Sequence, residues 1–134
     1  MASKGKPYRT VVVGEFEVFI GRGSDENDAL TFHVAEPHDT WLHVGGGTPG
    51  SHVVIRNPEK KPIPRDVLET VAAYTAHYSK ARGAAKVEVD YCLASHVKKP
   101  RGAPAGLVEL TAVGAVRLAR DVRLDRARRQ SQAG

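Results

Sequence analysis

The sequence contains one cysteine, Cys92, among 134 residues. A single thiol cannot form an internal disulfide, and it excludes a metal site built from several cysteines. No basic residue stands beside it in the sequence to activate it. We therefore expect Cys92 to be a small buried thiol with no chemical role.

Long apolar stretches are also absent. No run of 18 or more apolar residues occurs, so no segment has the composition of a membrane-spanning helix. The basic start MASKGKPYRT has no apolar stretch behind it, which distinguishes it from a secretory signal. We expect a cytoplasmic protein with no membrane partner.

What remains is the composition of an ordinary globular domain. The chain is 41% hydrophobic and 26% charged, which is typical of soluble domains, and its length suits a single one. We expect residues 1–112 to form this domain. Residues 113–134 are expected to form a basic extension that is partly helical or disordered, because its charged stretch RLARDVRLDRARRQ offers no apolar face.

Positive charge is in excess and unevenly placed. The formal net charge is +5, yet acidic residues dominate between Gly14 and Thr48. The basic residues gather later, around residues 56–65, 98–101 and 117–129. Potentials from neighbouring cations add within a Debye length of about 8–10 Å, so such groups favour a polyanionic partner. The alternative is a basic surface with no partner.

The hydrophobic periodicity predicts an α+β fold. Alternation of apolar and polar residues predicts two strands within residues 8–22 around a turn at Gly14, and further strands at residues 40–44, 51–56 and 86–91. A helix start at Ser24 or Asp25 predicts about one helical turn. Residues 107–113 read as another strand.

Residues 65–83 show the clearest helical pattern. Val67, Val71 and Tyr74 lie on one apolar stripe, and Gly83 is a natural stop. A strand, a helix and a strand in succession make a crossover, so we expect the two flanking strands to run parallel. The prediction is a mixed, largely antiparallel sheet with this one main helix packed on it.

The stretch DTWLHVGGGTPGSHVVIR, residues 39–56, carries most of the chemistry-bearing side chains. A metal site is one interpretation. The candidate ligands in and just before this stretch are His33, His38, Asp39, His43 and His52. Their spacing matches no compact zinc pattern. A serine nucleophile is a second interpretation, but Ser51 lacks the second glycine of a nucleophile elbow.

Anion binding accounts for more of these residues. The glycine run can bring backbone N–H groups into a concave nest, because glycine adopts left-handed conformations without strain. Ser51 and His52 would add donors at its end, with Arg56 beyond them. Trp41 and His43 share one face of the predicted strand, where a base could stack. The alternatives are a long hairpin turn and a core tryptophan.

The stretch VKKPRGAPAG is a second candidate contact for phosphate. Lys98, Lys99 and Arg101 place three cations in four positions, and the prolines limit the conformational entropy of the loop. A solvated loop is the alternative. Two basic, glycine-bearing loops together favour nucleic acid as the partner.

These stretches, taken together, resemble the NFACT-R domain, the RNA-binding module of the RqcH/NEMF ribosome-quality-control family. The shared motifs are D-x-W-L-H, P-G-S-H-V, V-x-V-D-Y and V-K-K-P-x-G, within residues 8–111. The sequence departs from the family pattern at Gly23, where the pattern has asparagine, and at Ala105, where it has proline. The resemblance does not extend to the large N-terminal domain and coiled-coil arms of full-length members, so a free-standing version of the domain is expected and tail synthesis on stalled chains is not implied.

The resemblance implies a module for structured RNA, tRNA or rRNA, possibly on the ribosome, in translation quality control or RNA metabolism. It leaves open a protein partner from an RNA-processing or translation complex, and we expect no cofactor, no bound metal and no catalytic residue. The residues expected to contact RNA are Arg22, Asn27, Trp41, His43, Ser51, His52, Arg56, Lys98, Lys99 and Arg101. The competing hypothesis is an enzyme acting on RNA, metal-assisted or acid–base, through Asp39, His43 and His52.

Overall fold

A computed structural model describes residues 8–46, 48–111 and 113–119 of the chain. Its elements follow in this order: β1 (Tyr8–Val13), β2 (Phe16–Gly21), α1 (Ser24–Ala29), the π-helical turn η1 (Leu30–Val34), β3 (Thr40–Val44), β4 (Val53–Ile55), α2 (Arg65–His77), β5 (Lys86–Leu93), the 3-10 turn η2 (Ala94–His96), β6 (Val97–Lys98), β7 (Glu109–Leu110) and β8 (Gly114–Ala119). No helix in these ranges is long and apolar enough to cross a membrane.

Six strands form one sheet in the order β1-β2-β4-β3-β5-β8. The first two make the predicted hairpin, in which Gly14 has a φ of 60° and Val13 faces Phe16 across the turn. A positive φ at the first position of a two-residue turn matches the twist of the strands, and glycine adopts it without strain. The α+β prediction is confirmed.

The crossover differs from the expected one in a single respect. Strands β4 and β5 flank α2 in the sequence, and both pair antiparallel with β3, which lies between them. Strands β4 and β5 are therefore parallel to each other, as predicted, but they are not neighbours in the sheet. Every pairing between the described strands is antiparallel, so the sheet is not mixed.

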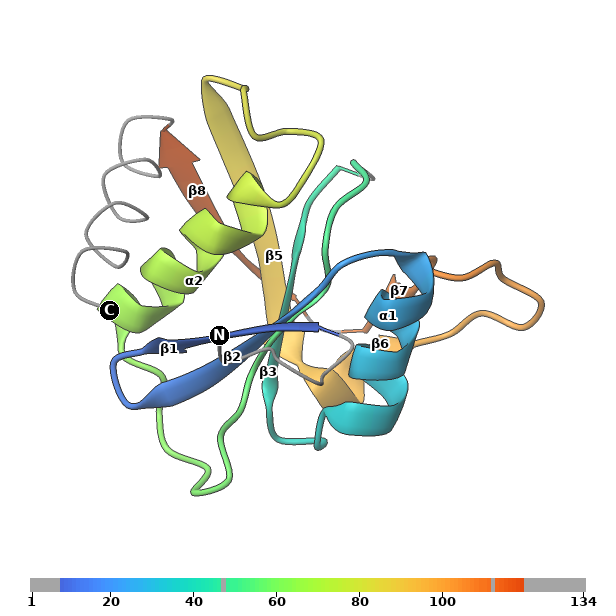
Figure 1. Cartoon of the computed structure of the whole chain (residues 1–134), viewed down its shortest axis with the longest axis horizontal. Coiled ribbons are helices and arrows are strands. Elements are labelled where there is room, and N and C mark those ends of the chain that lie inside the picture. Colours follow the sequence, from blue (N-terminus) through green and yellow to red (C-terminus); the bar gives the residue numbers. More distant parts are fainter. Residues whose placement is uncertain (1–7, 47, 112, 120–134) are drawn as a thin grey trace.

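Helix α2 covers one face of this sheet (Figure 1). Val67 and Val71 of its predicted stripe are buried against sheet residues such as Ile20, Leu42 and Ile55, and Tyr74 is partly buried. Each fully buried aliphatic side chain of this kind contributes about 1.5–3 kcal/mol. This layer is the main hydrophobic core.

The helix ends at His77, earlier than the predicted stop at Gly83. The chain leaves the helix because Ser79 bridges to Gly50, and the N–H of Lys80 donates to the carbonyl of Pro49 at 2.9 Å. Backbone groups that would have continued the helix are satisfied by a segment that lies 30 residues earlier.

The opposite face of the sheet is covered by α1 and η1, which together extend beyond the single turn predicted. The second core lies beneath them and contains Leu30, Trp41 and Val54, with Cys92 at its edge. Cys92 is buried as expected, and burial raises the pKa of its thiol to about 11. A thiol with that pKa stays protonated and unreactive at neutral pH.

The last strands depart from the predicted pattern. Among the described residues of this range, 107–111 and 113, only Glu109–Leu110 is a strand, and it pairs with β6 in a separate two-stranded sheet. Strand β8 pairs with β5 along six residues, so this part of the predicted extension forms the edge of the main sheet. Residues 120–134 of the extension lie outside the described residues.

Candidate nucleic-acid interface

Trp41 is a core residue. It is 1% exposed, and its Nε1–H donates to Thr31 Oγ1 at 3.0 Å. The ring face is packed beneath α1 and η1, where no base can reach it. This burial, by a helical segment from elsewhere in the chain, favours the alternative of a core tryptophan over a base stacked on Trp41.

His52 is buried beside Trp41 and takes part in the same polar chain. Its Nδ1 lies 2.9 Å from Thr31 Oγ1, and its ring meets the indole edge-on at 5.1 Å. Burial, followed by repulsion from His43, lowers the pKa of His52 to about 4. A neutral His52 with Nδ1 unprotonated accepts the hydroxyl hydrogen of Thr31 and completes the chain.

Asn27 and Ser51 hold two loops together. Asn27 Oδ1 accepts the backbone N–H of His52 at 3.1 Å, and Asn27 Nδ2 donates to the carbonyl of Gly50 at 3.3 Å. Ser51 Oγ donates to the carbonyl of Gly21. A Cβ on Gly21 would lie 2.0 Å from Asn27 Oδ1, so only glycine permits this packing. These contacts within the protein fix Asn27, Ser51 and His52 in place, and the contacts of these residues with RNA stay a prediction.

Asp39 and Arg56 form a separate ion pair. Arg56 Nε lies 2.8 Å from Asp39 Oδ2, although its N–H points off the line of a hydrogen bond. Asp39 is fully buried and also accepts the backbone N–H groups of Glu36 and Asn57. Its role is to join the start of β3 to the end of β4. Arg56 remains partly exposed beside it.

The three residues of the enzyme hypothesis, Asp39, His43 and His52, do not lie together at one site. Asp39 and His43 stand four positions apart along extended chain, a separation of about 13 Å. Only the two histidines meet, with ring centroids 5.2 Å apart. Among residues 8–46, 48–111 and 113–119, no three His, Cys, Asp or Glu side chains are placed to hold a metal ion.

The basic loop between β6 and β7 is anchored by its own lysine. Lys99 Nζ pairs with Asp28 Oδ2 at 2.9 Å and donates to the carbonyls of Pro104 and Leu107. The N–H of Gly106 donates to the other oxygen of Asp28 at 3.0 Å. Burial would raise the pKa of Asp28, but these two partners outweigh it and lower the pKa. Lys99 therefore holds the loop to α1.

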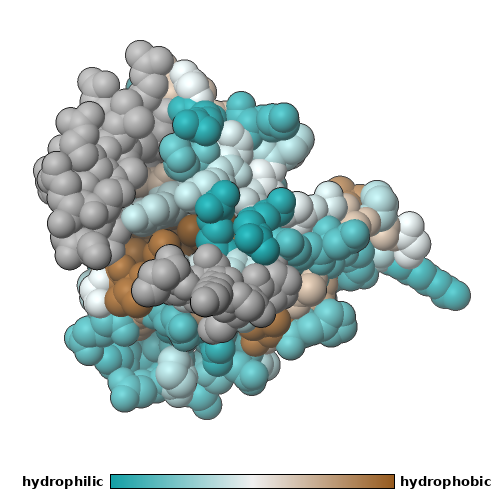
Figure 2. Space-filling model, viewed as in Figure 1, coloured by the Kyte–Doolittle hydropathy of each residue, from teal (hydrophilic) through white to brown (hydrophobic). Residues whose placement is uncertain are grey.

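Lys98 and Arg101 are the exposed cations of this region. The loop, orange in Figure 1, projects from the body of the protein, and Figure 2 shows a hydrophilic tip on it. Gly102 at the tip has a φ of 78°, which closes the turn. Both cations are free to meet an incoming phosphate from solvent.

A groove with a volume of about 440 Å³ runs between this loop, strand β3 and the glycine-rich loop, which is the connection from β3 to β4. Its polar lining includes His43, Thr48 and Asp90, and its apolar wall includes Leu107 and Val108. Burial lowers the pKa of His43, against the opposing effect of the carbonyls of Val44 and Gly50. His43 is half-buried and neutral, so of the predicted aromatic residues it is the one that a ligand in this groove can reach.

A second groove, of about 390 Å³, adjoins the first at Pro49 and Gly50. Its cations are Arg22, Lys80 and Arg82, all on exposed residues. Lys80 and Arg82 were not among the residues that the sequence predicted for RNA binding. The signal that could have found them is the basic run YSKAR itself.

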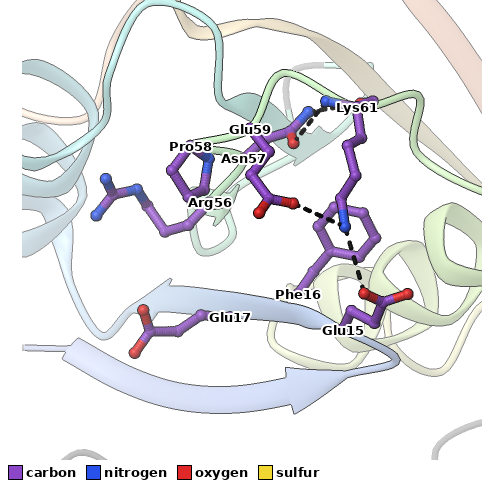
Figure 3. Close-up of a pocket in the computed structure, with 8 residues that line it drawn as sticks. All are labelled: Glu15, Phe16, Glu17, Arg56, Asn57, Pro58, Glu59 and Lys61. Carbon is purple, nitrogen blue, oxygen red and sulfur yellow. Dashed lines mark hydrogen bonds and ion pairs between the residues drawn. The ribbon is translucent and has the colours of Figure 1, made fainter.

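A third pocket, about 370 Å³ in volume, lies near the β1–β2 turn (Figure 3). It is lined by Glu15, Glu17 and Glu59, with Lys61 paired to two of these carboxylates at 3.3 and 3.0 Å. The pocket therefore carries three carboxylates, and its Lys61 is already paired with two of them. Such a pocket is unsuited to a polyanion.

Comparisons with known proteins show the family of this chain. Residues 6–112 match the family described as NFACT protein RNA binding domain. The protein named Rqc2 homolog RqcH from Bacillus subtilis (strain 168) is 39% identical over 110 residues, which cover 78% of this chain and 19% of that protein. Its counterpart of the same name from Streptococcus suis (strain 05ZYH33) is 37% identical over 105 residues, 77% of this chain and 18% of that protein.

A solved structure shows the same fold. The C-terminal part of the fibronectin/fibrinogen-binding protein from Streptococcus suis superposes with a TM-score of 0.76 at 33% identity, covering 85% of this chain and 45% of that one. The chain thus spans about a fifth of the length of the curated relatives it matches.

Proposed function

Because the chain belongs to the family of NFACT RNA-binding domains, we propose that it binds structured RNA, tRNA or rRNA, in translation quality control or RNA metabolism. The RNA backbone would lie along the two adjoining grooves, and the bases would face the half-buried His43.

The convergence of exposed cations from distant segments is the observation that carries this proposal. Arg22 follows β2, Lys80 and Arg82 follow α2, and Lys98 and Arg101 belong to the β6–β7 region. The grooves that separate them share Pro49 and Gly50. Cations that flank a continuous furrow can neutralise phosphates of a strand and release its counterions, and Arg22, which pairs with Glu26 at 3.2 Å, contributes least to this.

The buried polar residues support this surface from beneath. Asn27 and His52 fix the glycine-rich loop against α1, and the ion pair of Lys99 with Asp28 fixes the basic loop. Preorganised loops lose less conformational entropy when RNA binds. The motif residues of the sequence thus shape the surface, and the exposed cations make the contacts.

Salt dependence provides the test. The full chain is titrated with a fluorescent tRNA transcript at several salt concentrations. The double variant Lys98→Gln, Arg101→Gln should bind more weakly, and its slope of log affinity against log salt should become shallower by up to about two.

Lys60→Gln with Lys86→Gln is the matched control, because it removes two exposed charges from residues that line neither groove. It should leave the slope nearly unchanged. Equal losses in the two double variants would show that binding follows net charge alone and would reject this interface.

A further inference from the structure

The first groove contains a carboxylate that phosphate binding does not explain. Asp90 lines it and is half-buried. Within the part of the chain that the structure describes, no hydrogen bond or ion pair reaches this carboxylate. Burial, and then the charge of Glu88, raise the pKa of Asp90. A carboxylate that is partly desolvated without any donor is an exception among protein side chains, and it suits a ligand that brings donors of its own.

The glycine-rich loop leaves room for these oxygens. A Cβ on Gly45 would lie 3.2 Å from both carboxylate oxygens of Asp90, which is tighter than ordinary van der Waals contact. The N–H of Gly45 donates to the carbonyl of Glu88 at 2.9 Å, so the loop stays close to β5 at this point. The absence of a side chain at position 45 keeps the carboxylate accessible from the groove.

The rest of the groove suits a flat, largely apolar ligand. His43 is the direct cross-strand neighbour of Asp90, so the two side chains stand on the same face about 5 Å apart at their Cβ atoms. The ring of His43 is nearly parallel to the indole of Trp41, at 5.9 Å and 21°, which fixes its plane. Leu107 and Val108 form the opposite wall. A volume of about 440 Å³ is within the range of about 300–1,000 Å³ found for small-ligand sites.

A carboxylate repels phosphate, so the part of RNA that fits here is the edge of a base. Two carboxylate oxygens side by side match two adjacent N–H donors. Guanine offers such a pair, N1–H and N2–H, on its Watson–Crick edge. Adenine and cytosine offer one amino group each, and uracil offers one N–H between two carbonyl oxygens that a carboxylate repels.

We propose that the groove binds one unpaired guanine of RNA, with its N1–H and N2–H donating to the two carboxylate oxygens of Asp90 and its ring against His43. This inference rests on the proposed function, since it names the base that the RNA-binding surface selects. The base must be unpaired because a Watson–Crick partner would occupy the same edge.

Four hairpin RNAs with one common stem test the selection. Each has a seven-nucleotide loop of uridines whose central position is guanosine, inosine, adenosine or uridine. Fluorescence anisotropy with the full chain should give the tightest binding for guanosine, at least about fivefold tighter than for uridine. Inosine, which keeps N1–H and lacks the amino group, should fall between them.

Asp90→Asn should reduce this preference for guanosine to about twofold or less, since one acceptor oxygen becomes a donor. Glu88→Gln is the control: it removes the same charge from the same strand at an exposed position outside the groove, it also releases Arg117 from an ion pair at 2.9 Å, and it should keep the preference. Thermal melts on both variants confirm folding, and the guanosine–inosine comparison in the unmodified chain tests the proposal without any variant.

Equal affinity for the four hairpins, or a preference that persists in Asp90→Asn, would overturn the guanine proposal while RNA binding itself stands. Uniformly tighter binding of both Asp90→Asn and Glu88→Gln to all hairpins would show that Asp90 acts only by repelling phosphate, and would overturn it also. If the chain binds neither these hairpins nor tRNA, the proposed function fails and this inference fails with it.

Discussion

At the scale of single residues, several polar and aromatic side chains of the DTWLH and GSHVV stretches are buried in the interior. Trp41 and His52 are both 1% exposed, and the hydroxyl of Thr31 connects them. Buried polar groups of this kind are stabilising only when each has its partner in the correct protonation state. The folded state therefore depends on a neutral His52.

Stability should accordingly fall with acid. The pKa of His52 is about 4 in the folded protein and about 6.5 when unfolded. The unfolded chain then binds more protons between these values, so the stability that this residue contributes is present above pH 6.5 and is lost as the pH falls towards 4, by roughly 3 kcal/mol. Urea unfolding between pH 8 and 4 measures this loss.

The lowered pKa values of His43 and His77 act in the same direction. Titration of the histidine ring signals by NMR assigns the effect. A His52 ring that titrates near pH 6.5 in the folded protein would contradict the buried, neutral state.

At the scale of elements, the β6–β7 loop combines one anchoring cation with two exposed ones. Lys99 is held by Asp28 and two carbonyl oxygens, whereas Lys98 and Arg101 are exposed. Adjacent lysines thus have different roles, because the loop folds back on α1 at Lys99. A cation already paired on the protein contributes little to counterion release.

The variants Lys98→Met and Lys99→Met should separate these roles. Lys98→Met removes a phosphate contact, so the salt dependence of tRNA binding should become shallower by about one. Lys99→Met should leave the salt dependence unchanged and weaken binding at every salt concentration by several-fold, because the released loop must be ordered on binding.

Amide exchange gives an independent measurement of the loop. The N–H of Gly106, which donates to Asp28, should exchange faster in Lys99→Met and not in Lys98→Met. A salt slope that becomes shallower by the same amount in both variants would assign a phosphate contact to Lys99.

At the scale of the whole molecule, the glycine-rich loop joins the two layers. Gly50 bridges to Ser79 just after α2, while Asn27 on α1 donates to the carbonyl of the same glycine. Helices α1 and α2 lie on opposite faces of the sheet. The glycine-rich loop contacts both of them at the edge of the sheet. The two grooves adjoin at the same point.

Gly50→Ala should therefore destabilise the protein. The added Cβ would lie 2.7 Å from Ser79 Cβ and 3.1 Å from its Cα, a clash that requires a backbone shift. We expect a loss of about 1–3 kcal/mol in the free energy of unfolding. Gly23→Ala is the control, because its Cβ would meet nothing within 4 Å and its backbone is extended. Equal stability of the two variants by urea unfolding would contradict this role of Gly50.

The sequence by itself determined the local elements of this protein and the family to which it belongs. The alternation in FEVFI and KVEVDY, and the stripe of Val67 and Val71, depend on neighbours two to four residues away, so strands and helix were predictable from them. The RNA-binding family was recognisable for a related reason, since its motifs are short and contiguous.

Only the tertiary structure decided which of those motif residues are buried and which stay exposed. A strand pattern cannot tell which face will be covered, and η1 buried Trp41 by packing from outside the strand. Helix α2 ended early because Ser79 met Gly50, which brought Lys80 beside Arg22. Each of these outcomes depends on contacts between residues far apart in the chain, and a pattern read along the chain contains no information about such contacts.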